Sequence, residues 1–195
     1  MQYFSAEDTA LLLIDHQVGT MQLIKNLDMA VVKKNTLALA KAARILGLPV
    51  VLTSSQEDRL QGPLMPELKE ILPEAFAKRV RRAGIVNAWT DENFRRAALE
   101  TGRRNFAMAG VTTDVCLVYP TISARREGFG VQAIMDASGS PFEISEDMSR
   151  RRMENEGVVL TATNTLIAEL AQDWSRPEGS ALLNLLFTEV LPHIG

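Results

Sequence analysis

The sequence predicts a three-layer α/β/α domain with a central, mainly parallel sheet. Short apolar segments alternate with longer stretches whose apolar residues recur at helical spacing, a pattern typical of parallel sheets covered by helices on both faces. Hydrophobic residues make up 46% of the 195 residues, enough for a sizeable core. No internal repeat or low-complexity linker divides the chain, so we expect one domain over residues 1–195.

The strands are predicted from short apolar runs bounded by turn residues or by helical patterns. In chain order these runs cover residues 9–15, 48–55, 104–111, 130–138 and 158–163, with residues 84–89 as a further short extended piece.

The helices are predicted from apolar periodicity together with residues that start and stop helices. Thr90 and Ser145 are the expected N-caps of two of them, and glycines are the expected stops of four. The predicted helices cover residues 28–47, 62–73, 90–102, 113–128, 145–157 and 164–174. Residues 175–195 are apolar without a clear period, and we expect this segment to cover the domain or to pack in an oligomer interface.

Charge and cysteine content narrow the classes of function. The formal net charge is −3 and no long run of one sign occurs, so we expect no nucleic-acid partner. The apolar run at residues 10–14 is too short to span a membrane, and we expect no membrane partner. A single cysteine excludes an intrachain disulfide and fits a reducing compartment, so we expect a cytoplasmic protein.

The site is expected beyond the carboxyl ends of the strands, where ligands bind in open α/β sheets. Cys116 follows the strand at 104–111 and should lie in the first turn of a helix, where free amides and the helix dipole favour a thiolate. The alternative is that this lone cysteine is a small buried hydrophobe. Asp15 ends the first strand and is either a general base or a cap or arginine partner.

Histidine is scarce, which limits other mechanisms. A Cys–His pair would need His16 or His193. His16 follows Asp15 directly, so its side chain should point to the opposite side of the strand. His193 is expected at the surface or in an interface. No Cys or His set has the spacing of zinc ligands and no GxxxxGK[ST] motif occurs, so we expect neither a metal nor another cofactor.

Four segments, taken together, resemble the isochorismatase-like cysteine hydrolases, and in particular their YcaC-related branch. They are LLLIDHQ, RRAGIVNAW, AGVTTDVCLVYPTISARREGF and GVQAIMDASG, and the similarity runs from about residue 9 to 174. The resemblance implies a Rossmann-like fold and a catalytic set of an aspartate, a basic residue and a nucleophilic cysteine. Asp15 and Cys116 match the first and the last of these.

The motif does not decide which residue is the basic one, because most of the superfamily has lysine at this position. We prefer Arg82, which lies immediately before the AG that leads into IVNAW, with Lys78 as a nearby competitor. An arginine stays charged and donates in a fixed geometry, so Arg82 should act as an electrostatic clamp on Asp15 that favours the thiolate of Cys116.

The resemblance also implies a cis peptide bond between Val111 and Thr112. Its expected consequence is that the amides of Thr112 and Cys116 face one developing oxyanion. Relatives that bind a metal to hydrolyse nicotinamide carry histidines after the second strand, and residues 52–63 contain none. We expect the substrate pocket to be lined by further side chains, each with a core or capping role as the alternative: Gln17, Asn87, Trp89, Thr113 and Tyr119.

The sequence therefore predicts a hydrolase that cleaves a small amide through a thioester on Cys116. Two alternatives stay open on the same fold: a non-catalytic oligomeric module that binds a small molecule, and a thiol redox sensor without a resolving cysteine. YcaC-like relatives form rings and octamers, so the resemblance implies a homo-oligomer, with an octamer as one size.

Overall fold

A six-stranded, all-parallel sheet forms the centre of the computed structural model, which describes residues 3–192. Its strands lie in the order β3-β2-β1-β4-β5-β6, as expected for a doubly wound sheet. The strands are β1 (Thr9–Ile14), β2 (Val50–Ser55), β3 (Val80–Arg82), β4 (Asn105–Gly110), β5 (Gly130–Ile134) and β6 (Val159–Thr161). The prediction of a three-layer fold around a parallel sheet is confirmed.

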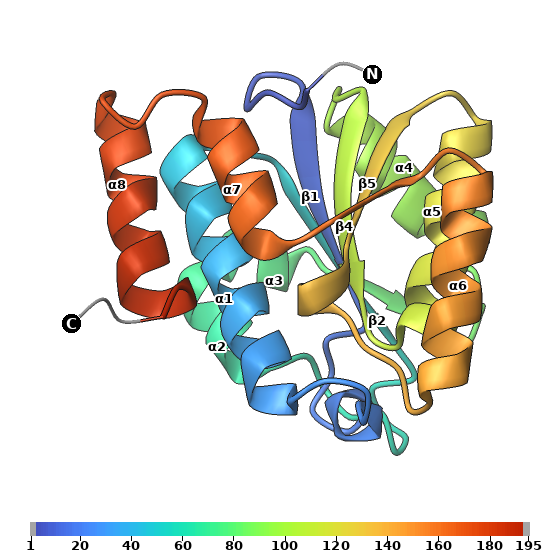
Figure 1. The fold of residues 1–195 in the computed structure, drawn as a ribbon. Coiled ribbons are helices and arrows are strands. Elements are labelled where there is room, and N and C mark those ends of the chain that lie inside the picture. The colour runs from blue at the N-terminus through green and yellow to red at the C-terminus, as the bar shows by residue number, and fades with distance from the viewer. Residues whose placement is uncertain (1–2, 193–195) are drawn as a thin grey trace.

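Helices cover both faces of the sheet (Figure 1). One layer contains α1 (Met29–Leu46), α2 (Pro66–Ile71), α3 (Pro73–Ala77), α7 (Thr163–Ala171) and α8 (Pro177–Leu185). The other contains α4 (Glu92–Glu100), α5 (Val118–Arg126) and α6 (Glu143–Asn155). Within the described part of the chain, no helix combines the length and hydrophobicity needed to cross a membrane.

Strand β1 shows why the sheet needs both layers. All six of its residues are buried. Leu11 and Leu13 pack into the core beneath α1, whereas Leu12 and Ile14 pack into the core beneath α5. A strand that is buried on both faces is apolar throughout, which is why the sequence shows a continuous run there instead of an alternation.

The ends of α1 lie where the sequence placed them. The carboxylate of Asp28 accepts a hydrogen bond from the amide of Ala30 at 2.8 Å and caps the helix. Gly47 has a φ of +64° and ends the helix in the left-handed conformation that glycine adopts at little cost.

The third strand differs from the prediction. It covers Val80–Arg82, directly before the expected extended piece, and pairs with β2 so that Ser55 lies opposite Arg82. Residues 84–89 form bends and the start of a 3₁₀ turn (Ala88–Thr90) instead. Because it contains two arginines, this strand is not an apolar run of the kind that predicted the other strands. It is an edge strand, where charged side chains are common.

Two predicted helix starts are also wrong by one or two residues. Asp91, not Thr90, caps α4, because its carboxylate accepts hydrogen bonds from the amides of Asn93 and Phe94. Helix α6 begins at Glu143, before Ser145, and has no side-chain cap.

The C-terminal segment is helical and not irregular. It forms α8 and a π-helical turn (Leu186–Val190), and its residues Leu182, Leu185 and Leu186 are buried in the core that α1 also lines. Lys41 of α1 donates to the carboxylate of Glu189 at 2.6 Å. In the described residues, the segment therefore covers this domain, which was one of its two expected roles.

Asp136, just after β5, caps α7, which begins 27 residues later in the sequence. Its Oδ1 atom accepts hydrogen bonds from both the amide and the hydroxyl of Thr163, at 2.8 Å each, at the first residue of α7. We expect Asp136→Ala to lower the free energy of unfolding by about 1 kcal/mol, because a helix amide loses its acceptor. Denaturant unfolding at a fixed protein concentration measures this loss.

Asp147→Ala is the matched control for this variant. Asp147, on α6, has a side chain that is 49% exposed, and within residues 3–192 its one ion pair is with Arg151, one turn away, so its loss should cost less than about 0.5 kcal/mol. Equal effects of the two variants would contradict a capping role for Asp136.

Candidate active site

The three predicted catalytic residues meet at the carboxyl edge of the sheet. Asp15 follows β1, Arg82 ends β3 and Cys116 lies in a π-helical turn (Thr113–Leu117) that follows β4. Parallel strands bring their carboxyl ends to one edge, so residues that are distant along the chain become neighbours. Asp15 and Arg82 are only 2% and 3% exposed, and Cys116 is half-buried.

Arg82 binds Asp15 through one nitrogen. Its Nη2 atom contacts both carboxylate oxygens and lies 2.5 Å from Oδ1. Its other nitrogens are also engaged, since Nε donates to the Thr53 hydroxyl at 3.1 Å and Nη1 donates to the Ile85 carbonyl. The competitor Lys78 lies at the end of α3 and lines a different hollow, so Arg82 is the basic residue of this site.

The backbone at Asp15 turns sharply out of the strand. Asp15 has a φ of +59°, which is uncommon for a residue other than glycine and is often found at functional sites. Its amide donates to the Thr53 carbonyl at 2.9 Å, and its carbonyl accepts from the amide of Gln17 at 2.7 Å. These two bonds hold the carboxylate at the end of β1 against β2.

The sulfur of Cys116 lies beside two groups that act on its pKa. They are the carboxylate of Asp15, which raises it, and the Thr112 amide, which lowers it. The Val111–Thr112 peptide bond is cis, as the family resemblance implied. The Cys116 amide donates to the Thr112 carbonyl at 2.7 Å, so it is engaged within the turn. Of the two amides expected at an oxyanion, only that of Thr112 faces the sulfur, and the oxyanion role stays a prediction.

Burial is the largest influence on the pKa values of Asp15 and Cys116. Burial raises the pKa of Asp15, and the Arg82 guanidinium opposes this increase. Burial also raises the pKa of the Cys116 thiol well above its usual value, and the negative charge of Asp15 adds to the effect. Burial and the Asp15 carboxylate therefore act against the thiolate that the sequence predicted, and the protonation state of the sulfur stays a prediction.

A cavity of about 300 Å³ opens over these groups. Asp15, Arg82, Thr112 and Cys116 form its base, and Gln17 lines it as predicted. The rest of the wall comes from the loops after β1, β2 and β3 and from the π-helical turn: Thr20, Leu23, Ser55, Gln56, Gln61, Gly84, Ile85, Val86 and Val115.

Comparison with known proteins identifies the family of the chain. Residues 9–165 match the isochorismatase domain. The chain belongs to the isochorismatase family. It is 39% identical over 177 residues to the probable hydrolase YcaC of Escherichia coli, across 90% of this chain and 84% of that protein.

Two solved structures of the family agree with the fold. YcaC from E. coli, described as an octameric hydrolase of unknown specificity, superimposes with a TM-score of 0.92 at 37% identity and covers 97% of this chain and 92% of its own. YcaC from Pseudomonas aeruginosa, solved with hexane-2,5-diol and covalent acrylamide, gives a TM-score of 0.89 at 39% identity and covers 94% and 91%.

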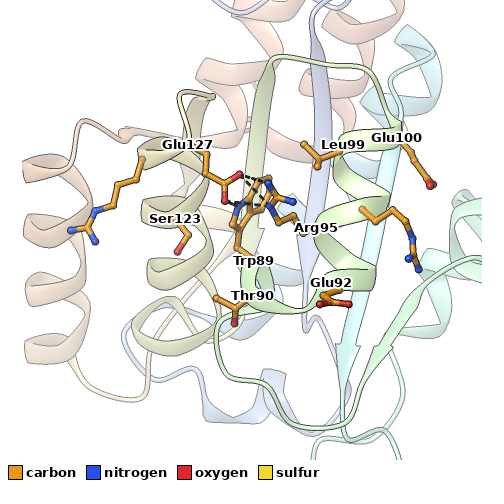
Figure 2. A pocket seen from close by; sticks show the side chains of 10 residues that line it. Trp89, Thr90, Glu92, Arg95, Leu99, Glu100, Ser123 and Glu127 are labelled. Atoms are coloured by element: carbon orange, nitrogen blue, oxygen red, sulfur yellow. Dashed lines mark hydrogen bonds and ion pairs between the residues drawn. The ribbon is translucent and has the colours of Figure 1, made fainter.

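Two of the residues expected to line the pocket, Asn87 and Trp89, lie outside the cavity lining. Asn87 caps the turn before α4 and donates to the Ser123 hydroxyl at 2.9 Å. Trp89 is 2% exposed, and its Nε1 atom donates to Glu127 at 2.9 Å. Figure 2 shows Trp89 and Glu127 in a surface groove between α4 and α5, without Asp15 or Cys116 among the lining residues. Both residues have the capping and core roles that were their alternatives.

Thr113 and Tyr119 also lie outside the cavity lining. Thr113 is completely buried, and its amide donates to the Gly139 carbonyl at 2.8 Å. Tyr119 packs against the core beneath α5, and the guanidinium of Arg152 lies 5.3 Å from the centre of its ring. From this part of the chain, Val115 and Cys116 of the π-helical turn line the cavity instead.

The residues that sequence reasoning missed are mostly uncharged loop residues. Thr20, Gln56 and Gln61 lie on the loops after β1 and β2, and Val86 lies four residues after β3. Thr20, Gln56 and Gln61 had one detectable signal, their position after the carboxyl end of a predicted strand, whereas Val86 fell inside the extended piece predicted at 84–89. No residue type marked them as functional.

His16 takes no part in the cavity. It is completely buried, and its Nε2 atom lies 2.9 Å from the Ala137 carbonyl, on the far side of β1 from Asp15. His193 lies outside the described residues. Among residues 3–192, no three His, Cys, Asp or Glu side chains lie close enough together to hold a metal ion.

Burial of His16 should make stability pH-dependent. Burial lowers its pKa from 6.5 to about 4, so the unfolded chain binds a proton more readily than the folded one between these values. This stabilisation is complete above pH 6.5 and is lost as the pH falls toward 4. The expected loss is about 3 kcal/mol.

Denaturant unfolding of the wild type and of His16→Gln at pH 7 and pH 4.5 tests this prediction. The free energy of unfolding of the wild type should fall more steeply than that of the variant, which has no titrating group at this position. A difference between the two proteins that stays constant with pH would show that folding does not lower the pKa of His16.

Proposed function

We propose that this chain is a cysteine-dependent hydrolase that cleaves a small amide at its C–N bond, through a thioester on Cys116. One observation carries the proposal. The carboxylate of Asp15 lies beside the Cys116 thiol and is held by Arg82, and all three residues line a cavity that admits a small molecule. This is the arrangement of a nucleophile, a base and a group that orients the base.

In the first half of the reaction, the sulfur of Cys116 attacks the amide carbonyl while its proton moves to Asp15. The thiol has a raised pKa, so a base must take its proton during the attack. Burial raises the pKa of Asp15 as well, which strengthens it as a base and reduces the difference between the two groups. Asp15 then gives the proton to the departing nitrogen, the C–N bond breaks and the acyl group stays on sulfur.

In the second half, water hydrolyses the thioester. Asp15, again ionised, accepts a proton from the water as its oxygen attacks the carbonyl. The carbon–sulfur bond then breaks, the carboxylic acid leaves and the proton returns to the Cys116 sulfur. One water is consumed, and the thiol and the carboxylate are restored.

Arg82 acts through Asp15 in this scheme. All three of its nitrogens are hydrogen-bonded, so it holds the carboxylate in place and keeps it ionised without moving a proton. The Thr112 amide, which acts on the sulfur in the resting site, is the backbone donor that we assign to the oxyanion that forms beside it.

The relatives support the coarse part of this proposal. One is named as a probable hydrolase, and the E. coli structure is described as a hydrolase. The P. aeruginosa structure contains covalent acrylamide, which is a small amide and a reagent for thiols. The redox-sensor alternative is less well supported, because peroxide reacts with thiolates and burial raises the pKa of Cys116.

Assembly and location are part of the same proposal. The E. coli relative is octameric, and we expect this chain to form a homo-oligomer of the same kind. The nucleophile must be a free thiol, so we place the protein in the reducing cytoplasm.

Loss of the sulfur tests the proposed chemistry. In a screen of small neutral amides, Cys116→Ala should lower kcat/KM by at least about a thousandfold, because no acyl-enzyme can form. Intact mass measured after rapid acid quenching should show an acyl adduct on the wild type alone. Circular dichroism and light scattering of both proteins control for fold and assembly.

Undiminished turnover by Cys116→Ala would refute the mechanism. A wild type that turns over none of the amides but binds one of them reversibly would instead favour the non-catalytic module.

A further inference from the structure

We propose that the cavity over Cys116 selects an uncharged substrate group, so that the carbonyl and its nearest substituents enter as a small neutral unit. This inference rests on the proposed function and specifies its substrate class. A volume of about 300 Å³ has room for roughly ten non-hydrogen atoms, taking about 30 Å³ for each. The bound group is therefore small, and its charge is the property that the lining residues decide.

The cavity wall carries only two charges among the described residues, and these neutralise each other. They are the carboxylate of Asp15 and the guanidinium of Arg82, which are in direct contact. Every other lining residue is uncharged. An anionic group that entered would lose its hydration without gaining a counter-ion, which is costly for a charge and much less so for an amide.

The existing hydrogen-bond donors are not free to bind a resting anion. Each nitrogen of Arg82 already donates, to Thr53, Ile85 or Asp15. The backbone of the π-helical turn is also engaged, since the amides of Val115, Cys116 and Leu117 donate to the Thr112 carbonyl. Gln17 is committed as well, because its amide nitrogen donates to the carbonyls of Ser55 and Gly62. A substrate carboxylate would have to compete with Asp15 for the guanidinium.

The polar groups that remain available are neutral. The hydroxyl of Thr20 is buried and has no hydrogen-bond partner within residues 3–192, although the residue lines the cavity. Gln61 donates to the side-chain oxygen of Gln56 at 3.1 Å and keeps its own oxygen as an acceptor. Hydroxyl and amide groups of this kind pair well with an uncharged amide, which both donates and accepts.

The mouth of the cavity is apolar. Leu23, Ile85, Val86 and Val115 are 40–56% exposed and line the cavity. Beyond them lies a hollow of about 910 Å³, which shares Thr20, Leu23, Gln56 and Gln61 with the cavity and whose wall carries the exposed side chains of Asp58 and Arg59. Charged parts of a substrate can stay in this hollow, while the apolar mouth admits only the neutral part.

Alkylation of Cys116 with a matched pair of reagents tests the inference. Iodoacetamide is neutral, and iodoacetate is an anion of almost the same size. Cys116 is the only cysteine, so alkylation reports on this site alone. Both reagents react with the same thiolate, so its pKa cancels from the ratio of their rate constants. We expect this ratio to exceed that of 2-mercaptoethanol at the same pH and salt concentration by about tenfold or more.

Val86→Lys adds a cation to the exposed part of the wall, and Val86→Met is its uncharged control of similar length. Val86 is 56% exposed, so both variants should fold. We expect the lysine variant to bring the ratio at least severalfold closer to that of 2-mercaptoethanol, and the methionine variant to leave it unchanged.

A wild-type ratio equal to that of 2-mercaptoethanol would overturn the inference. So would a ratio that the lysine and methionine variants change equally, because charge would not then be the cause. These results are independent of turnover. If the cavity discriminates between the reagents but Cys116→Ala hydrolyses amides as well as the wild type, the proposed mechanism fails while the selectivity stands.

Discussion

The contact between Arg82 and Asp15 is the constraint on which the rest of the site depends. A buried carboxylate is costly unless it is paired, and the Arg82 Nη2 atom touches both of its oxygens. Arg82 is itself held by Thr53 and by the Ile85 carbonyl, so one side chain links the ends of β1, β2 and β3. Cys116 arrives from β4 and completes the site. The pair leaves the cavity without net charge, which is the origin of the proposed preference for neutral substrates, whereas the basic character of Asp15 comes from its burial.

Much of the fold followed from the sequence because parallel strands and amphipathic helices leave strong local patterns. The five strands predicted from apolar runs exist, and α1 begins and ends at its predicted residues. The errors arose where tertiary contacts override local pattern. Strand β3 is made of Val80–Arg82, and its arginines are explained by an edge position and by a partner, Asp15, that lies 67 residues away in sequence. The sequence of the last helix, α8, shows no clear apolar period, because its buried residues are those that pack in the core with α1.

The candidate site was predictable only in part. Asp15, Arg82 and Cys116 have unusual residue types at strand ends, and the motifs of the family mark all three. The lining residues carry no such signal, and a large aromatic side chain was a poor guide to the pocket. Trp89 fills the core beneath α4, whereas Val86 and Val115 line the cavity. The direction of the pKa shift of the Cys116 thiol was also not predictable. A helix N-terminus suggested a thiolate, but burial beside a carboxylate raises the pKa of the thiol, and burial is known only from the packed structure.

The most direct measurement is the pKa of the Cys116 thiol in the wild type and in Asp15→Asn, obtained from the pH dependence of its alkylation by iodoacetamide. If Asp15 is an ionised base in contact with the sulfur, removal of its charge should lower the pKa of Cys116 while turnover is lost. A pKa that is unchanged or higher in Asp15→Asn would show that the carboxylate does not act on the sulfur, and would contradict the account of this site.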